Sequence, residues 1–161
     1  MSIVRHDHFH TGIVVADIDA SAAELTAIAG LTWSPRLETD VPIWAPGGTV
    51  TMRRMSAVYS VEAPHLELIT DVPGSLWTVS DRPVHHFGYW SDDLLGESAE
   101  LERRGLPRVA AAVAGGEFYG FSYHTTRDGL LIELVDRNVF PDWEGFLRGR
   151  TAFAGRSAVT S

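Results

Sequence analysis

Residues 10–18 read HTGIVVADI, and residues 86–94 read HFGYWSDDL, 76 positions further along the chain. Both segments place a glycine two residues and an aspartate seven residues after the histidine. Glu24-Leu25 and Glu100-Leu101 extend the match at equal offsets from each histidine, and LELI at 66–69 corresponds to IELV at 132–135. The sequence therefore contains an internal repeat in which each copy carries one histidine and one glutamate.

Each copy predicts the order strand–helix–strand–strand–strand. In the first copy a strand over 8–15 precedes a helix over 20–29, which Asp17 or Asp19 can cap and Gly30 can end. Strands are expected over 33–41, 49–60 and 65–70. In the second copy a strand over 84–90 precedes a helix capped by Asp92 or Asp93. Strands over 106–112, 118–125 and 130–136 follow, with Asp128-Gly129 as a hairpin turn, and a short helix is expected near 141–147.

Two such halves favour an α+β fold in which helices cover one side of a curved sheet. We expect one domain over 1–161, with module one at about 6–71, module two at about 84–137 and a C-terminal helix and tail over 138–161. Hydrophobic residues make up 45% of the chain and charged residues 21%, which are ordinary values for a globular protein.

Composition also narrows the location and the partners. No apolar run approaches the length of a membrane span, and the first residues do not resemble a secretory signal, so we expect a cytoplasmic protein. The absence of cysteine excludes disulfides, thiolate zinc sites and a cysteine nucleophile. A formal net charge of −8 and the lack of a basic cluster argue against nucleic acid as a partner.

Strand alternation suggests which histidines share a face. His6, His8, His10 and Gly12 are expected to point the same way, whereas His85 and His86 point in opposite directions. The alignment of the two copies selects His86 as the counterpart of His10. His6 and His8 are expected to be exposed residues near the N-terminus.

Glu67 and Glu133 each lie between apolar neighbours on a strand that should be central and buried. An unpaired ionised carboxylate in that setting costs several kcal/mol, and neither strand has an adjacent Lys or Arg. One glutamate alone is commonly paired with a distant arginine, but two at equivalent positions favour a shared counter-charge. A divalent cation bound by both glutamates and by the imidazoles of His10 and His86 would supply it, with Zn, Ni, Co, Mn and Fe equally suitable.

Four segments in the order of the repeat resemble the vicinal oxygen chelate superfamily, the group of glyoxalase I, methylmalonyl-CoA epimerase, fosfomycin-resistance proteins and extradiol dioxygenases. They are HTGIVVADI from residue 10, HLELI from residue 65, HFGYWSDDL from residue 86 and GLLIELVD from residue 129, and the similarity covers about residues 6–137. The resemblance implies two tandem βαβββ modules that form an open, curved mixed β-sheet barrel around one divalent ion. It also implies that the metal ligands are His10, Glu67, His86 and Glu133. This ligand set is more like that of glyoxalase I than that of the epimerase branch, which often has Gln where this chain has Glu67.

A six-coordinate ion with four protein ligands keeps two neighbouring positions for two substrate oxygens. We therefore expect a metal-dependent isomerase or lyase that transfers a proton next to a carbonyl, with Glu133 and Glu67 as candidate bases. One alternative is an Fe(II) extradiol-type ring-cleaving dioxygenase, and another is a non-catalytic small-molecule binding protein of the antibiotic-resistance type. His65, His124 and Tyr123 are candidate substrate-binding residues. The many aromatic residues favour an apolar or aromatic small-molecule substrate, and the resemblance implies a homodimer, with the pairing of the halves within one chain or across the dimer left open.

Overall fold

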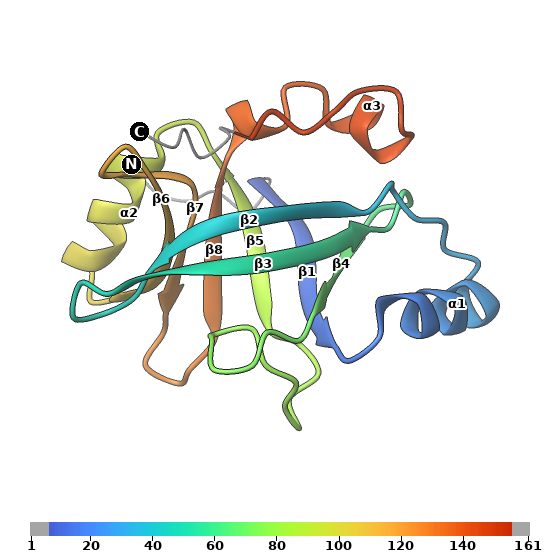
Figure 1. Ribbon diagram of the computed structural model, residues 1–161, viewed down its shortest axis with the longest axis horizontal. Helices are drawn as coiled ribbons and strands as arrows, with labels where there is room; N and C mark the ends of the chain where they lie inside the picture. Colours follow the sequence, from blue (N-terminus) through green and yellow to red (C-terminus); the bar gives the residue numbers. More distant parts are fainter. Residues whose placement is uncertain (1–6, 156–161) are drawn as a thin grey trace.

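The computed structural model describes residues 7–155, in which eight strands form a closed barrel (Figure 1). The strands are β1 (His8–Val15), β2 (Leu37–Trp44), β3 (Val50–Tyr59), β4 (His65–Thr70), β5 (His86–Ser91), β6 (Arg108–Ala114), β7 (Glu117–Thr125) and β8 (Leu131–Asp136). Their order around the barrel is β1-β4-β3-β2-β6-β7-β8-β5. The predicted α+β fold of two βαβββ modules is confirmed, although the ring of hydrogen-bonded strands is closed rather than open. The two modules pair within one chain, a point that the sequence left open.

The two halves of the barrel have the same topology. β1 is parallel to β4 in the first half, as β5 is to β8 in the second, and the remaining pairs within each half are antiparallel. The halves meet at two antiparallel seams, between β1 and β5 and between β2 and β6. Because β1 and β5 are neighbours, the two histidine motifs of the repeat lie side by side.

Helices α1 (Ile18–Ala29), α2 (Leu94–Arg103) and α3 (Trp143–Leu147) lie outside the barrel (Figure 1). Asp17 caps α1 by accepting a hydrogen bond from the backbone N–H of Ala20, and Asp93 caps α2 in the same way through Gly96. Ile18 packs with Val58 and Leu68 of the first half, while Leu94 and Leu101 pack with Leu134 of the second. The aspartates shared by the two repeats therefore start equivalent helices.

Two predicted strands are displaced along the sequence. The strand expected over 33–41 runs instead from Leu37 to Trp44, because Trp33 makes only an isolated bridge with Ser60 and Pro35 interrupts the segment. The strand expected from residue 106 begins at Arg108, directly after Pro107. None of the helices within residues 7–155 has the length and apolar character required to span a bilayer.

A β-bulge changes the pattern of faces at the start of β1. His8 is paired with Tyr89 and His10 with Gly88, so Phe9 is an extra residue on β1. Phe9 is buried and stacks on Trp90 with ring centroids 3.6 Å apart, whereas His8 is exposed. The prediction that His8 shares a face with His10 is therefore wrong, because the bulge shifts the alternation by one residue. The predicted exposure of His8 is confirmed, and His6 lies outside the described residues.

Candidate metal centre

The candidate ligands come from four neighbouring strands, β4, β1, β5 and β8. In the register of these strands, Gly12 lies between Glu67 and His86, and Gly88 lies between His10 and Glu133. Each half thus contributes a histidine from its first strand and a glutamate from its fourth. A glycine between them across the sheet leaves space for both side chains.

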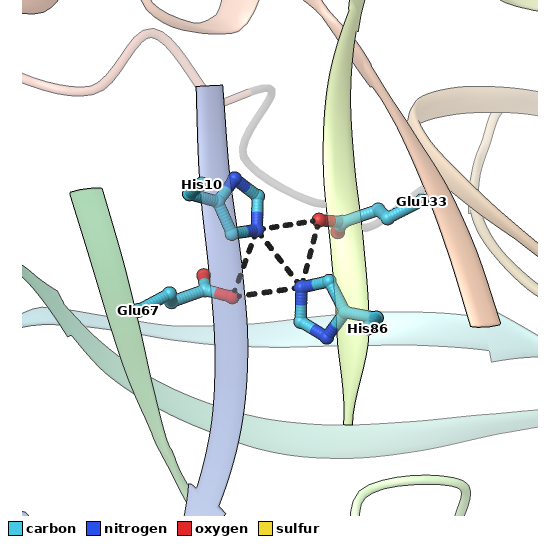
Figure 2. A group of neighbouring side chains, drawn as sticks. All are labelled: His10, Glu67, His86 and Glu133. Carbon is cyan, nitrogen blue, oxygen red and sulfur yellow. Dashed lines mark hydrogen bonds and ion pairs between the residues drawn. The ribbon is translucent and has the colours of Figure 1, made fainter. Parts of the chain in front are cut away.

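The four side chains converge on one point (Figure 2). Nε2 of His10 lies 3.3 Å from Oε2 of Glu67 and 3.1 Å from Oε2 of Glu133. Nε2 of His86 lies 3.2 Å from each of these oxygens, and the two Nε2 atoms are 2.8 Å apart. All four atoms lie within 4.8 Å of one another. The structure therefore brings together the four residues that the repeat selects.

This arrangement fits a divalent cation. Metal–ligand bonds of about 2.1 Å at right angles separate neighbouring ligand atoms by about 3.0 Å, close to the spacings between these atoms. Oε2 of Glu67 and Oε2 of Glu133 are buried and have no hydrogen-bond partner, and the two histidines are fully buried. A single cation would satisfy both orphaned oxygens and both imidazoles at once, which neighbouring hydrogen-bond donors do not.

The pKa shifts of the four groups also indicate that the buried carboxylates require a positive charge beside them. Burial alone lowers the pKa of His86, but the carboxylates of Glu133 and Glu67 outweigh it and raise the pKa to about 9. The pKa of His10 is also raised, because the two carboxylates outweigh its burial. Burial favours a higher pKa for each glutamate, and the facing histidines reverse this and lower it. In the absence of a metal, protons on the imidazoles thus neutralise the buried carboxylates.

His85 fixes the tautomer of His86, a role that sequence reasoning missed. Nε2 of His85 lies 3.0 Å from the carbonyl oxygen of Leu76, which only accepts, so this nitrogen carries the hydrogen. Burial is the main cause that lowers the pKa of His85, which keeps its ring neutral and leaves Nδ1 as an acceptor. Nδ1 of His86, 2.8 Å away, must then donate to it. The lone pair on Nε2 of neutral His86 consequently points into the ligand cluster.

Two tyrosines complete the symmetry of the site. Tyr59 on β3 is paired with Glu67, and Tyr123 on β7 is paired with Glu133. The ring of Tyr59 packs edge-to-face on His10, and that of Tyr123 packs on His86. Burial and then the two carboxylates raise the pKa of both phenols well above the ordinary value, so the hydroxyls stay protonated. The sequence pointed to Tyr123 but not to Tyr59, because the tyrosine precedes its glutamate by ten residues in one copy and eight in the other.

The other two candidate histidines do not line the cavity at the site. Nδ1 of His65 bonds to the carbonyl oxygen of Ser60, and Nε2 accepts from the indole of Trp143. His124, on β7, is fully buried against α2, with Nε2 2.8 Å from the hydroxyl of Ser98 and Nδ1 bonded to the carbonyl of Leu106. These positions do not support contact of either histidine with a substrate.

A cavity of about 710 Å³ opens onto the cluster. Glu67 and Glu133 line it together with Tyr59 and Tyr123, whereas His10 and His86 do not. Of the four candidate ligands, the glutamates are therefore the side chains that a molecule in the cavity would meet.

Solved structures with this fold include several methylmalonyl-CoA epimerases. One is a complex with methylmalonyl-CoA and NH4+, which is 18% identical with a TM-score of 0.56 and covers 81% of this chain and 93% of that one. The enzyme from Mycobacterium tuberculosis is 20% identical with a TM-score of 0.54 and covers 84% and 89%. A variant of the Streptomyces coelicolor enzyme with 2-nitronate-propionyl-CoA is 18% identical with a TM-score of 0.57 and covers 84% and 98%. At sequence identities this low, the structural similarity establishes a shared fold.

No curated protein matches the sequence. Residues 9–123 match the family model described as the Glyoxalase/Bleomycin resistance protein/Dioxygenase superfamily, a segment that includes three of the four converging side chains. The matched segment, the barrel of paired βαβββ halves and the vicinal oxygen chelate fold of the neighbours agree with the resemblance seen in the sequence. The chain belongs to the glyoxalase/bleomycin resistance protein/dioxygenase superfamily.

Proposed function

We propose that this protein is a divalent-metal-dependent enzyme that transfers a proton on the carbon next to a carbonyl of a small organic substrate, as an isomerase or lyase. His10, Glu67, His86 and Glu133 would hold the metal. The observation that carries the proposal is the convergence of these four buried donors beside a cavity that both glutamates line.

A bound divalent cation would act there as a Lewis acid towards a substrate carbonyl oxygen. Four protein donors leave room for a pair of substrate oxygens on a six-coordinate ion, but not for a catechol pair together with dioxygen. This donor set therefore supports proton transfer better than extradiol ring cleavage, which uses two histidines and one carboxylate.

Glu133 and Glu67 are the proposed bases, because they are the ligand side chains that reach the cavity. Their carboxylates come from β8 and β4 and reach the cavity close together, so either could take a proton from a substrate carbon held there. Tyr123 and Tyr59, protonated and paired with these residues across the strands, would keep the carboxylates in place. The apolar surroundings exclude water from the carbon acid and strengthen electrostatic interactions.

The test is metal analysis of the purified protein, followed by a screen for solvent deuterium exchange into 2-oxo compounds and acyl thioesters. The proposal expects one divalent metal per chain and metal-dependent exchange that Glu133→Gln or Glu67→Gln reduces by about a hundredfold or more. Glu117→Gln, a change at an exposed residue, is the matched control. Full exchange by both single variants would remove the glutamates as bases, and oxygen consumption with catechols would favour the dioxygenase instead.

A further inference from the structure

Among the residues that the structure describes, no basic side chain lines the cavity that opens onto Glu67 and Glu133. The charged residues that line it are Asp40, Glu67 and Glu133, all of them acidic. The sequence contains no lysine, so its 13 basic residues are all arginines, and none of the 11 arginines within residues 7–155 is part of the lining. A volume of about 710 Å³ is nevertheless large enough for an organic molecule with a ring system.

Arg54 is close to the cavity-lining Asp40 but already forms ion pairs. Arg54 lies 3.4 Å from the carboxylate of Asp40 and 3.5 Å from that of Glu38. Its neighbour Arg53 donates to the carbonyl oxygen of Gly74. An anionic group in the cavity away from the glutamates would therefore lose its hydration without gaining an arginine partner from residues 7–155, which disfavours its binding.

The walls of the cavity are instead hydrophobic and aromatic. Trp77, Phe121 and Tyr123 stand edge-to-face, with ring centroids 6.2 Å apart for Trp77–Phe121, 5.3 Å for Trp77–Tyr123 and 5.8 Å for Phe121–Tyr123. Val41, Met55 and Ile69 also line the cavity from the strands of the first half. Such surfaces gain free energy by covering apolar or aromatic area.

We infer that the substrate has an uncharged, hydrophobic or aromatic body, with two neighbouring oxygens at the end that meets the glutamates. Two carboxylates and a divalent cation sum to zero charge, so the metal end offers no excess positive charge for a distant anionic group. This inference rests on the proposed function, and it separates the chain from its structural neighbours. Methylmalonyl-CoA, the ligand of one neighbour, carries a carboxylate and several phosphate charges that this cavity would leave unpaired.

The experiment compares two ligands of the same shape by titration calorimetry on the metal-loaded protein. One is 1-phenylpropane-1,2-dione, which has an aromatic body and two neighbouring oxygens. The other is the same dione with a carboxylate at the para position of the ring. We expect the neutral dione to bind at least about tenfold more tightly, and methylmalonyl-CoA to bind more weakly than either. Equal or tighter binding of the para-carboxylate or of methylmalonyl-CoA, or no binding of the neutral dione, would overturn the inference.

A second experiment introduces a positive charge at the cavity. Thr39 lines the cavity on β2 and is only half-buried, so Thr39→Arg can be accommodated. This variant should bind the para-carboxylate compound about tenfold more tightly, which reduces the preference for the neutral dione. An unchanged preference in a folded variant would show that the missing cation does not set the selectivity.

Exchange of the methyl protons of the dione, followed by NMR in deuterated water, separates this inference from the proposed function. Tight, selective binding of the neutral dione without exchange would support the substrate class while contradicting the proton-transfer activity. Exchange into methylmalonyl-CoA, with no binding of the neutral dione, would support proton transfer and overturn the substrate class.

Discussion

A Cβ atom on Gly12 would lie 1.9 Å from Cε1 of His86, so the ring of His86 occupies the space that any other residue at position 12 would need. Gly88 has the same relationship to His10, again at 1.9 Å. The glycine two residues after each histidine therefore serves the histidine of the other half. This reciprocal packing explains why the repeat keeps His-x-Gly as a unit, and it places both rings against the glutamates.

Replacing Gly12 with Ala should displace the ring of His86 and weaken metal binding. We expect the dissociation constant for Zn²⁺ or Co²⁺, measured by competition with a chromophoric chelator, to rise by about tenfold or more. Overpacking should also lower the free energy of unfolding by about 1–3 kcal/mol. Thr11→Ala, on the same strand, is the control, and wild-type affinity in Gly12→Ala would show that the ring does not need this space.

The repeat pattern predicts the ligand set because the two halves are symmetric in sequence and in register. The bulge at Phe9 could not be predicted in this way, since nothing in the sequence around His8 distinguishes a bulge from regular alternation. The effect of His85 on the tautomer of His86 could not be predicted from the sequence either. Alternation indicated that its ring points away from His86, whereas the structure places the two Nδ1 atoms within hydrogen-bond distance.

His85→Phe should weaken metal binding although residue 85 is outside the ligand cluster. Without the acceptor at Nδ1 of His85, the hydrogen of neutral His86 can move to Nε2, and that nitrogen loses its lone pair. The expected loss of metal affinity is about 10–100-fold, and the Co²⁺ absorption spectrum should change in shape. His8→Phe, at an exposed histidine, should leave both unchanged, and a His85→Phe protein with wild-type affinity and spectrum would contradict the assigned tautomer.

Stability of the metal-free protein should fall at alkaline pH. The pKa of His86 in the folded protein is raised to about 9, above its ordinary value of 6.5, so its protonation stabilises the fold fully below about pH 6.5. This contribution is lost as the pH rises through about 9. Thermal unfolding in the presence of a chelator should therefore show a decreasing Tm over this range. The decrease should disappear when the protein is saturated with metal, because the imidazoles are then already deprotonated.

Metal removal should destabilise the protein and be reversible. A metal that binds the folded chain at 100 times its Kd adds about 2.7 kcal/mol to the free energy of unfolding. Chelation should lower Tm accordingly, and re-addition of the metal should restore it. Glu67→Gln should reduce this metal-dependent shift in Tm, whereas Glu117→Gln should retain it. An identical shift in both variants would mean that the stabilising ion binds elsewhere.

The most direct measurement is an anomalous difference map from a crystal of the protein grown with Zn²⁺ or Co²⁺. We expect one strong peak per chain, about 2.0–2.2 Å from Nε2 of His10, Nε2 of His86 and one oxygen each of Glu67 and Glu133. A peak bound by other residues, or saturating metal with no peak between these four side chains, would contradict this expectation.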